Sequence, residues 1–195
     1  AKVSEKNNRV PVELYEQYGV KRGLRDNSGA GVVTGITNIS LIQSKKDTPE
    51  GKVPCDGKLL YRGYNVIDLV RGCAEDGHFG FEEIAYLLLF GELPKEEELA
   101  EFRCVLGKLR KLPTNFTRDV IMKASSKDIM NTLTKSVLTL ASYDKRVADL
   151  STANVLRQCL NLISEFPMMA VYGYHAYNHY EKDDSLYIHR PDPKL

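Results

Sequence analysis

Histidine is the residue type in this chain with the widest chemistry, because imidazole transfers protons near neutral pH and also binds metal ions. His175 and His179 stand four residues apart, so on a helix their side chains lie on one face. A metal site there needs a third ligand, which Glu181, Asp183 or Asp184 could supply, but the H-E-x-x-H pattern of zinc enzymes is absent. We therefore interpret this pair as polar residues at the solvated end of a tyrosine-rich helix.

The other two histidines and one arginine carry weaker signals. His78 lies in a short glycine-flanked loop between two expected helices, and we expect it to be solvated. His189 lies in the stretch 187–191 near the end of the chain and is the most suggestive of the four. Arg62, beside a glycine turn, could bind an anion, but pairing with a carboxylate or a helix C-terminus is the simpler interpretation.

The sequence lacks the motifs of covalent and phosphate chemistry. It contains no G-x-S-x-G elbow, and neither phosphate loop, G-x-x-x-x-G-K-[ST] or G-x-G-x-x-G, is complete. The glycines of 29–31 and Gly35 are too loosely placed for such a loop and are more typical of a strand. The cysteines show neither C-x-x-C nor metal-ligand spacing, so we interpret them as reduced thiols rather than a disulfide or a reactive site; they are Cys55, Cys73, Cys104 and Cys159.

Composition excludes several classes of function. The 195 residues are 43% apolar and 27% charged, with a formal net charge of +1, so the clustered basic excess of a nucleic-acid-binding protein is missing. No apolar run approaches the roughly 20 residues that span a bilayer, and the first residues lack the apolar core of a secretory signal. We expect a cytoplasmic protein that binds neither membrane nor nucleic acid.

A small antiparallel sheet is expected near the N-terminus. Glycine alternates with β-branched residues from 29 to 37, followed by residues 38–42, which predicts a strand with a bend at Gly35. Residues 43–58 are polar and contain two prolines and two glycines, so they predict a surface loop. Residues 59–61 then return to the sheet.

Helical spacing dominates the remainder, so the predicted fold class is mainly α. The apolar residues of 81–88 fall at positions i, i+3, i+4 and i+7, and Gly91 and Pro94 end that helix. The other expected helices are 12–18, from 65 to about 77, the segment between Pro94 and Pro113, and a short one at 114–123.

Two further expected helices carry few charges. Lys135 is the only charged residue of 129–143, so this helix has no obvious solvent face and we expect it to be covered on more than one side. The helix 151–180 is long enough to cross the molecule, and Pro167 should kink it. The covering could come from the same subunit or from a second one, and the sequence leaves both open.

The phrases LLYRGY at 59–64 and FEEIAYLLLFGELP at 81–94 resemble the N-terminal, large-domain part of citrate synthase. The resemblance runs from about residue 23 to residue 195. Shorter matching phrases are 23–25, 36–40, 130–133, 162–167 and 191–193. Gly80 and Lys95 depart from the family, which often has hydroxyl helix caps there, and 43–58 is longer than the usual tight hairpin.

The resemblance implies a mainly helical homodimer that condenses acetyl-CoA with oxaloacetate to citrate and CoA. It also implies that the catalytic aspartate and histidines lie beyond Leu195. We therefore assign no catalytic, cofactor-binding or metal-binding residue in this chain and expect it to be inactive alone. No cofactor is expected, because acetyl-CoA is a substrate. In the family the helices corresponding to about 127–143 and 151–180 pack across the dimer axis, so we expect the homodimer to form there.

The expected organisation has three parts: an N-terminal extension with a short helix at 1–22, a small sheet region at 23–64, and the helical portion of a truncated large domain at 65–195. Two alternatives stay open. A 2-methylcitrate synthase shares the scaffold and takes propionyl-CoA. A short helical dimerisation module without catalysis belongs to a different class.

Overall fold

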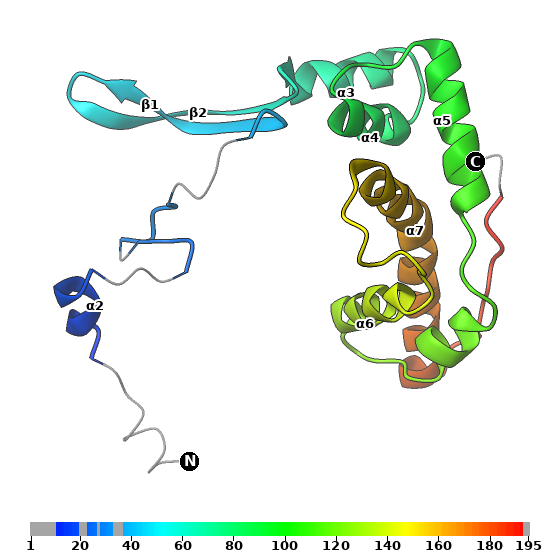
Figure 1. Ribbon diagram of the computed structural model, residues 1–195. Coiled ribbons are helices and arrows are strands. Elements are labelled where there is room, and N and C mark those ends of the chain that lie inside the picture. Colours follow the sequence, from blue (N-terminus) through cyan, green and yellow to red (C-terminus); the bar gives the residue numbers. More distant parts are fainter. Residues whose placement is uncertain (1–10, 20–22, 27, 33–36, 193–195) are drawn as a thin grey trace. The chain divides into compact units, whose positions relative to one another are not determined.

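The structure is a computed structural model that describes residues 11–19, 23–26, 28–32 and 37–192. The chain divides into two compact units, one up to Asn65 and one from Val66 onward. The first unit holds the strands and the second holds helices (Figure 1). None of the described helices is long and apolar enough to cross a lipid bilayer.

The first unit begins with a short helix and continues into a three-stranded sheet. Helix α2 covers Glu13–Gln17 and ends before Gly19, whose φ of 61° favours glycine. Strands β1 (Ser40–Thr48), β2 (Gly51–Tyr61) and β3 (Tyr64–Asn65) pair antiparallel in that order. The mainly helical class and the small antiparallel sheet are as the sequence predicts.

The surface loop expected at 43–58 is wrong, because these residues form most of a long β-hairpin. Asp47 pairs with Lys52 and Thr48 with Gly51, so the turn is limited to Pro49 and Glu50. At this turn the Thr48 hydroxyl donates to the carbonyl of Gly51 at 2.6 Å, and Gly51 has a φ of 117° that side chains rarely adopt. Both strands are largely exposed here, which removes the apolar alternation that marks a half-buried strand.

The strand expected from 29 to 37 is not formed by its described residues. Gly31 makes only an isolated antiparallel bridge with Arg25. Residues 33–36, including the bend expected at Gly35, lie outside the described residues. The sheet therefore begins at Ser40, within the phrase that followed the predicted strand.

Arg62 makes structural contacts, and the guanidinium partner found is an amide oxygen, where a carboxylate or a helix C-terminus was the simpler expectation. Its Nη1 donates to Oδ1 of Asn38 at 3.0 Å, and its backbone N–H donates to the carbonyl of Ile39 at 2.8 Å. The residue itself adopts a φ of 49° next to Gly63. These bonds fasten the turn after β2 to the segment that enters β1.

The second unit contains five α-helices and one π-helical stretch among its described residues. They are α3 (Val66–Glu75), α4 (Phe81–Phe90), α5 (Glu96–Leu109), η1 (Thr117–Met122), α6 (Ile129–Ala141) and α7 (Thr152–Lys182). Each expected helix is found within a few residues of its predicted bounds. At the end of α4, Gly91 adopts the left-handed conformation expected of a stop residue.

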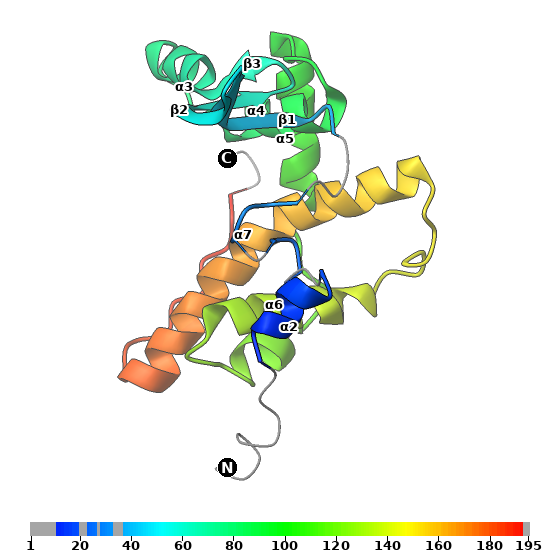
Figure 2. The same cartoon turned by 90° about the vertical axis from the view of Figure 1, so that its left-hand side faces the viewer.

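Helix α7 is the central element of this unit. It contacts α5, η1 and α6, and the core cluster forms around it. Pro167 lies near its middle, and Figure 2 shows the axis of α7 changing direction about midway, as a proline kink requires. Buried side chains from η1, α6 and α7 make up this core: Phe116, Ile121, Leu133, Met168, Met169 and Tyr172.

Helices α4 and α5 pack together through a group of aromatic side chains. The ring of Phe102 meets Tyr86 edge-on at 5.5 Å between centroids, and Phe90 completes the group. At Lys95, where a hydroxyl cap is missing, the carboxylate of Glu98 accepts from the backbone N–H of Lys95 at 2.8 Å. This bond compensates for the missing cap at the start of α5.

Candidate functional site

The two histidines spaced four residues apart on α7 do not form a ligand pair with the acidic residues beyond them. Nδ1 of His179 lies 2.8 Å from the carbonyl of Asp184. Glu181 instead forms an ion pair with Lys127 at 3.3 Å, and Asp183 ends α7 in the left-handed conformation. Of these acidic side chains, Glu181 pairs with Lys127, and Asp184 accepts from the backbone N–H of Ser185 at 2.8 Å.

His175 and His189 come together although they lie far apart in the sequence. Their ring centroids are 5.9 Å apart, and Tyr187 stacks almost parallel on His189. The segment after α7 returns along the helix, because the Tyr172 hydroxyl donates to the carbonyl of His189 at 2.7 Å. His189 is held through its backbone and its ring face, so its contacts fix the returning segment to α7.

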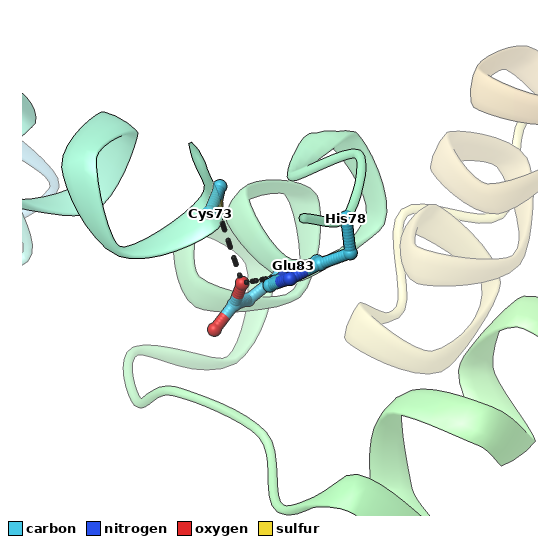
Figure 3. Close-up of side chains that lie close together, drawn as sticks. All are labelled: Cys73, His78 and Glu83. Carbon is cyan, nitrogen blue, oxygen red and sulfur yellow. Dashed lines mark hydrogen bonds and ion pairs between the residues drawn. The ribbon is translucent and has the colours of Figure 1, made fainter. Parts of the chain in front are cut away.

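His78 is not solvated as expected but belongs to a partly buried cluster with Cys73 and Glu83. Nε2 of His78 lies 3.0 Å from Oε2 of Glu83, and the Cys73 thiol donates to the same oxygen at 3.5 Å. Figure 3 shows the Glu83 carboxylate between the other two side chains. The His78 and Glu83 side chains are 30% and 23% exposed, so solvent still reaches the cluster.

The turn between α3 and α4 builds this cluster. The N–H of His78 donates to the carbonyl of Cys73 at 3.1 Å, and Gly77, with a φ of 66°, donates to Ala74 at 3.3 Å. These two bonds define a Schellman motif, which brings the third-last helical residue next to the second residue beyond the cap. Those two residues are Cys73 and His78. Glu83, in the first turn of α4, then reaches both.

Gly80 is required at this turn for space rather than for its backbone conformation. A Cβ atom on Gly80 would lie 2.4 Å from Sγ of Cys73 and 3.3 Å from its Cβ. Its φ of −84° suits any residue. The close approach to Cys73 explains why a glycine, and no hydroxyl cap, stands at the start of α4.

The electrostatics of the cluster favour a protonated thiol. Burial raises the pKa of Cys73, and the hydrogen bond and negative charge of Glu83 raise it further. The neutral thiol is therefore the donor to the Glu83 carboxylate. The arrangement gathers one sulfur, one imidazole nitrogen and one carboxylate oxygen within 4.8 Å of one another.

Two pockets flank α7 within the second unit. One, of about 490 Å³, is mainly apolar and is lined by Phe79, Phe81, Leu106, Ile163, Val171 and His189, among others. The other, of about 590 Å³, is here called the Glu165 pocket and carries charge; its lining includes Lys111, Tyr143, Asp144, Arg157, Gln158 and Glu165.

Two carboxyl groups of the Glu165 pocket have opposite pKa shifts. Burial raises the pKa of Glu165 to about 7. Hydrogen bonds from Gln158, from the backbone of Arg146 and from Arg157 lower the pKa of Asp144 to about 2. Nothing in the sequence marked either residue, because each shift depends on groups that only the fold brings together.

The fold and sequence agree with one family of known proteins. The family model described as "Citrate synthase, C-terminal domain" matches residues 27–194. The citrate synthase of Corynebacterium glutamicum is 31% identical over 153 residues, covering 76% of this chain and 33% of the relative. The citrate synthase of Saccharolobus solfataricus is 29% identical over 126 residues, covering 65% of this chain and 28% of the relative. A 2-methylcitrate synthase of Mycobacterium tuberculosis is 37% identical over 123 residues, covering 57% and 26%.

Solved structures show the same fold. The citrate synthase of Pyrobaculum aerophilum superimposes with a TM-score of 0.66 at 23% identity, over 87% of this chain and 39% of that one. A citrate synthase of Thermoplasma acidophilum, solved with carboxymethyl coenzyme A and oxaloacetate, gives 0.63 at 22% identity, over 83% and 37%. The chain belongs to the citrate synthase family. It spans about a third of the length of the curated relatives that it matches.

Proposed function

We propose that this chain supplies part of the helical scaffold of a citrate-synthase-type acyltransferase, which condenses acetyl-CoA with oxaloacetate to citrate and CoA. The observation that carries the proposal is the match of the family model to residues 27–194. The enzyme belongs to the tricarboxylic acid cycle in this proposal. Four free cysteines support a reducing, cytoplasmic location.

A second candidate is the 2-methylcitrate synthase reaction, in which propionyl-CoA replaces acetyl-CoA. It is supported by the 2-methylcitrate synthase of Mycobacterium tuberculosis, which is 37% identical over 123 residues, against 31% over 153 residues for the Corynebacterium citrate synthase. The two reactions differ by one methylene of the acyl group, and such a difference is decided by the few side chains that contact it.

We assign the acid–base groups of the reaction to residues outside this chain. Three observations support this assignment. The described histidines contact one another, tyrosines or Glu83. The chain corresponds to about a third of its relatives. Neither pocket beside α7 places a histidine within reach of an aspartate among its lining residues.

We also propose that the chain forms a homodimer through α6 and α7. Both helices keep apolar side chains that the described residues leave exposed. On α6, Met130 and Leu138 are 69% and 70% exposed. On α7, Val155, Leu162 and Phe166 recur at i, i+7 and i+11, which gives a partly exposed apolar stripe on one face. Uncovered apolar surface of this kind supports burial against a second copy.

The test of the enzymatic proposal is thioester consumption, followed through the ultraviolet absorbance of the thioester bond. A thiol reagent is unsuitable because the chain carries four cysteines. Oxaloacetate is supplied with acetyl-CoA in one series and propionyl-CoA in another. We expect no turnover by the 195-residue chain and turnover by the product of the coding sequence read beyond Leu195. Turnover by the short chain contradicts the placement of the catalytic groups, and a stop codon after Leu195 favours the non-catalytic module.

A further inference from the structure

We propose that Cys73, His78 and Glu83 form a zinc site that joins the end of α3 to the start of α4. The donor set is one thiolate sulfur, one imidazole nitrogen and one carboxylate oxygen, which are the three ligand types that zinc takes in proteins. This site is separate from the condensation reaction, and the proposal does not depend on that reaction.

The distances between the three ligand atoms suit a single ion. With zinc bonds of 2.0–2.3 Å, two ligands at tetrahedral angles lie about 3.3–3.6 Å apart. Sγ of Cys73 lies 3.5 Å from Oε2 of Glu83, and Nε2 of His78 lies 3.0 Å from the same oxygen. All three atoms fall within 4.8 Å. The two outer atoms, Sγ of Cys73 and Nε2 of His78, lie within 4.8 Å of each other, so they must approach by up to about 1.3 Å to reach zinc geometry.

The backbone fixes two of the ligands before any ion binds. The Schellman motif ties His78 to Cys73 through the bond from the His78 N–H to the Cys73 carbonyl at 3.1 Å. Gly80 lets the start of α4 approach Sγ of Cys73 more closely than any residue with a Cβ atom could. The backbone therefore holds the residues that carry the ligands close together, and side-chain rotations complete the site, which lowers the entropy lost on binding.

A hydrogen-bonded triad without metal is the competing explanation, and metal titration distinguishes it from a zinc site. Binding of a divalent ion releases the thiol proton of Cys73 to solvent and takes the place of the hydrogen between Nε2 of His78 and Glu83. The sulfur, the nitrogen and the oxygen then all bind the same ion. The partial exposure of His78 and Glu83 provides the entry path and admits water as the fourth ligand.

The experiment uses Co²⁺ as a spectroscopic stand-in for zinc on the purified, chelator-treated chain. We expect one equivalent to produce a sulfur-to-cobalt charge-transfer band that Zn²⁺ abolishes by competition. Cys73→Ser should lose the band, while His78→Gln and Glu83→Gln should weaken Co²⁺ binding more than about tenfold. Cys159→Ser is the matched control, because Cys159 is also partly buried but lies on α7, and it should keep the band.

A second measurement needs no substitution, so it holds even where a variant fails to fold. Alkylation of each cysteine by iodoacetamide is followed by mass spectrometry with and without Zn²⁺. Zinc should slow the alkylation of Cys73 more than about tenfold and leave exposed Cys104 unchanged. The proposal is overturned if folded protein shows no band, if Cys73→Ser and Cys159→Ser give equal bands, or if zinc does not protect Cys73.

Discussion

At the scale of single residues, Glu165 couples the stability of the second unit to pH. Its pKa is raised from 4.5 to about 7 by burial, so between these values the folded state keeps a proton that the unfolded state has lost. Stability therefore falls as pH rises from about 4.5 to 7, and the whole cost is present above 7. The neutral amide of Glu165→Gln does not titrate.

We expect Glu165→Gln to be more stable than the natural chain at about pH 8 and nearly equal to it at about pH 4. After allowance for solvent screening, the gain at the higher pH is on the order of 1 kcal/mol. Urea unfolding across this pH range measures it. The exposed Glu101→Gln on α5 is the control and should run parallel to the natural chain. If the unfolding free energy of Glu165→Gln also changes with pH in parallel with that of the natural chain, Glu165 is not shielded from water.

Gly80 gives a prediction about space. The added methyl of Gly80→Ala would meet Sγ of Cys73 at 2.4 Å, so the thiol must rotate away from Glu83. We expect a loss of about 1–2 kcal/mol in unfolding free energy. Gly72→Ala on α3 is the matched control, because a Cβ there meets nothing within 4 Å, and it should gain about 0.5–1 kcal/mol as a helix-interior glycine replaced by alanine. If both variants unfold at the same urea concentration, Gly80 does not lie as close to Cys73 as described.

The behaviour of His78 shows what sequence patterns miss at this scale. The flanking glycines correctly predicted a turn, and a turn normally exposes its residues. The Schellman geometry instead directs His78 back toward Cys73, five positions earlier, and Glu83 follows five positions later. Ligand spacings of five and five match no metal motif, so the cluster becomes visible only when two helix ends are placed in space.

At the scale of elements, buried Asn154 holds the connection between α6 and α7. Its Nδ2 donates to the carbonyls of Arg146 and Asp149 at 2.9 and 2.8 Å, and its Oδ1 accepts from Nε of Arg157 at 2.9 Å. These bonds satisfy the side-chain amide of Asn154, which water does not easily reach because Asn154 is only 2% exposed.

Asn154→Ala leaves those groups without their partner, and we expect it to lower the unfolding free energy by about 2–3 kcal/mol. Asn131→Ala is the control. Asn131 is exposed on α6, and its side chain makes no hydrogen bond to the residues that the structure describes. That variant should stay within about 0.5 kcal/mol of the natural chain. Thermal unfolding followed by circular dichroism compares them, and a similar loss in both variants would contradict the role of Asn154.

Helices and strands of this chain were predictable to different degrees for a physical reason. A helix leaves local marks, such as the Gly91 stop of α4 or the apolar spacing on its face, and these depend on a few neighbouring residues. The hairpin of β1 and β2 is exposed along most of its length. Because neither face of it is buried in a core, residues 43–58 do not alternate between apolar and polar side chains. Its prolines and glycines favour a loop, although Pro49 occupies the turn and Pro54 lies opposite Lys45, beside the register shift between Gln43 and Lys45.

At the scale of the whole molecule, the low charge of α6 and α7 is explained only in part within the chain. Lys135, the one charged residue of α6, donates to the carbonyl of Ala124, so it is used structurally. The inner face of α6 is buried through Thr132, Leu133 and Ser136. Its outer face, with Met130 and Leu138, stays exposed. We predict that a second subunit covers this outer face, and the assembly state tests this prediction.

Leu138→Glu is the sharpest test of that assembly, because it places a charge on the outer face of α6 without touching the core. We expect the natural chain to sediment as a dimer and Leu138→Glu to raise the dimer dissociation constant more than about tenfold, which corresponds to about 1.4 kcal/mol. Val70→Glu is the matched control, since Val70 is similarly exposed, at 64%, but lies on α3. Its dissociation constant should match that of the natural chain. A natural chain that stays monomeric over a wide concentration range contradicts the interface, and so does a Leu138→Glu variant that dimerises as well as the control.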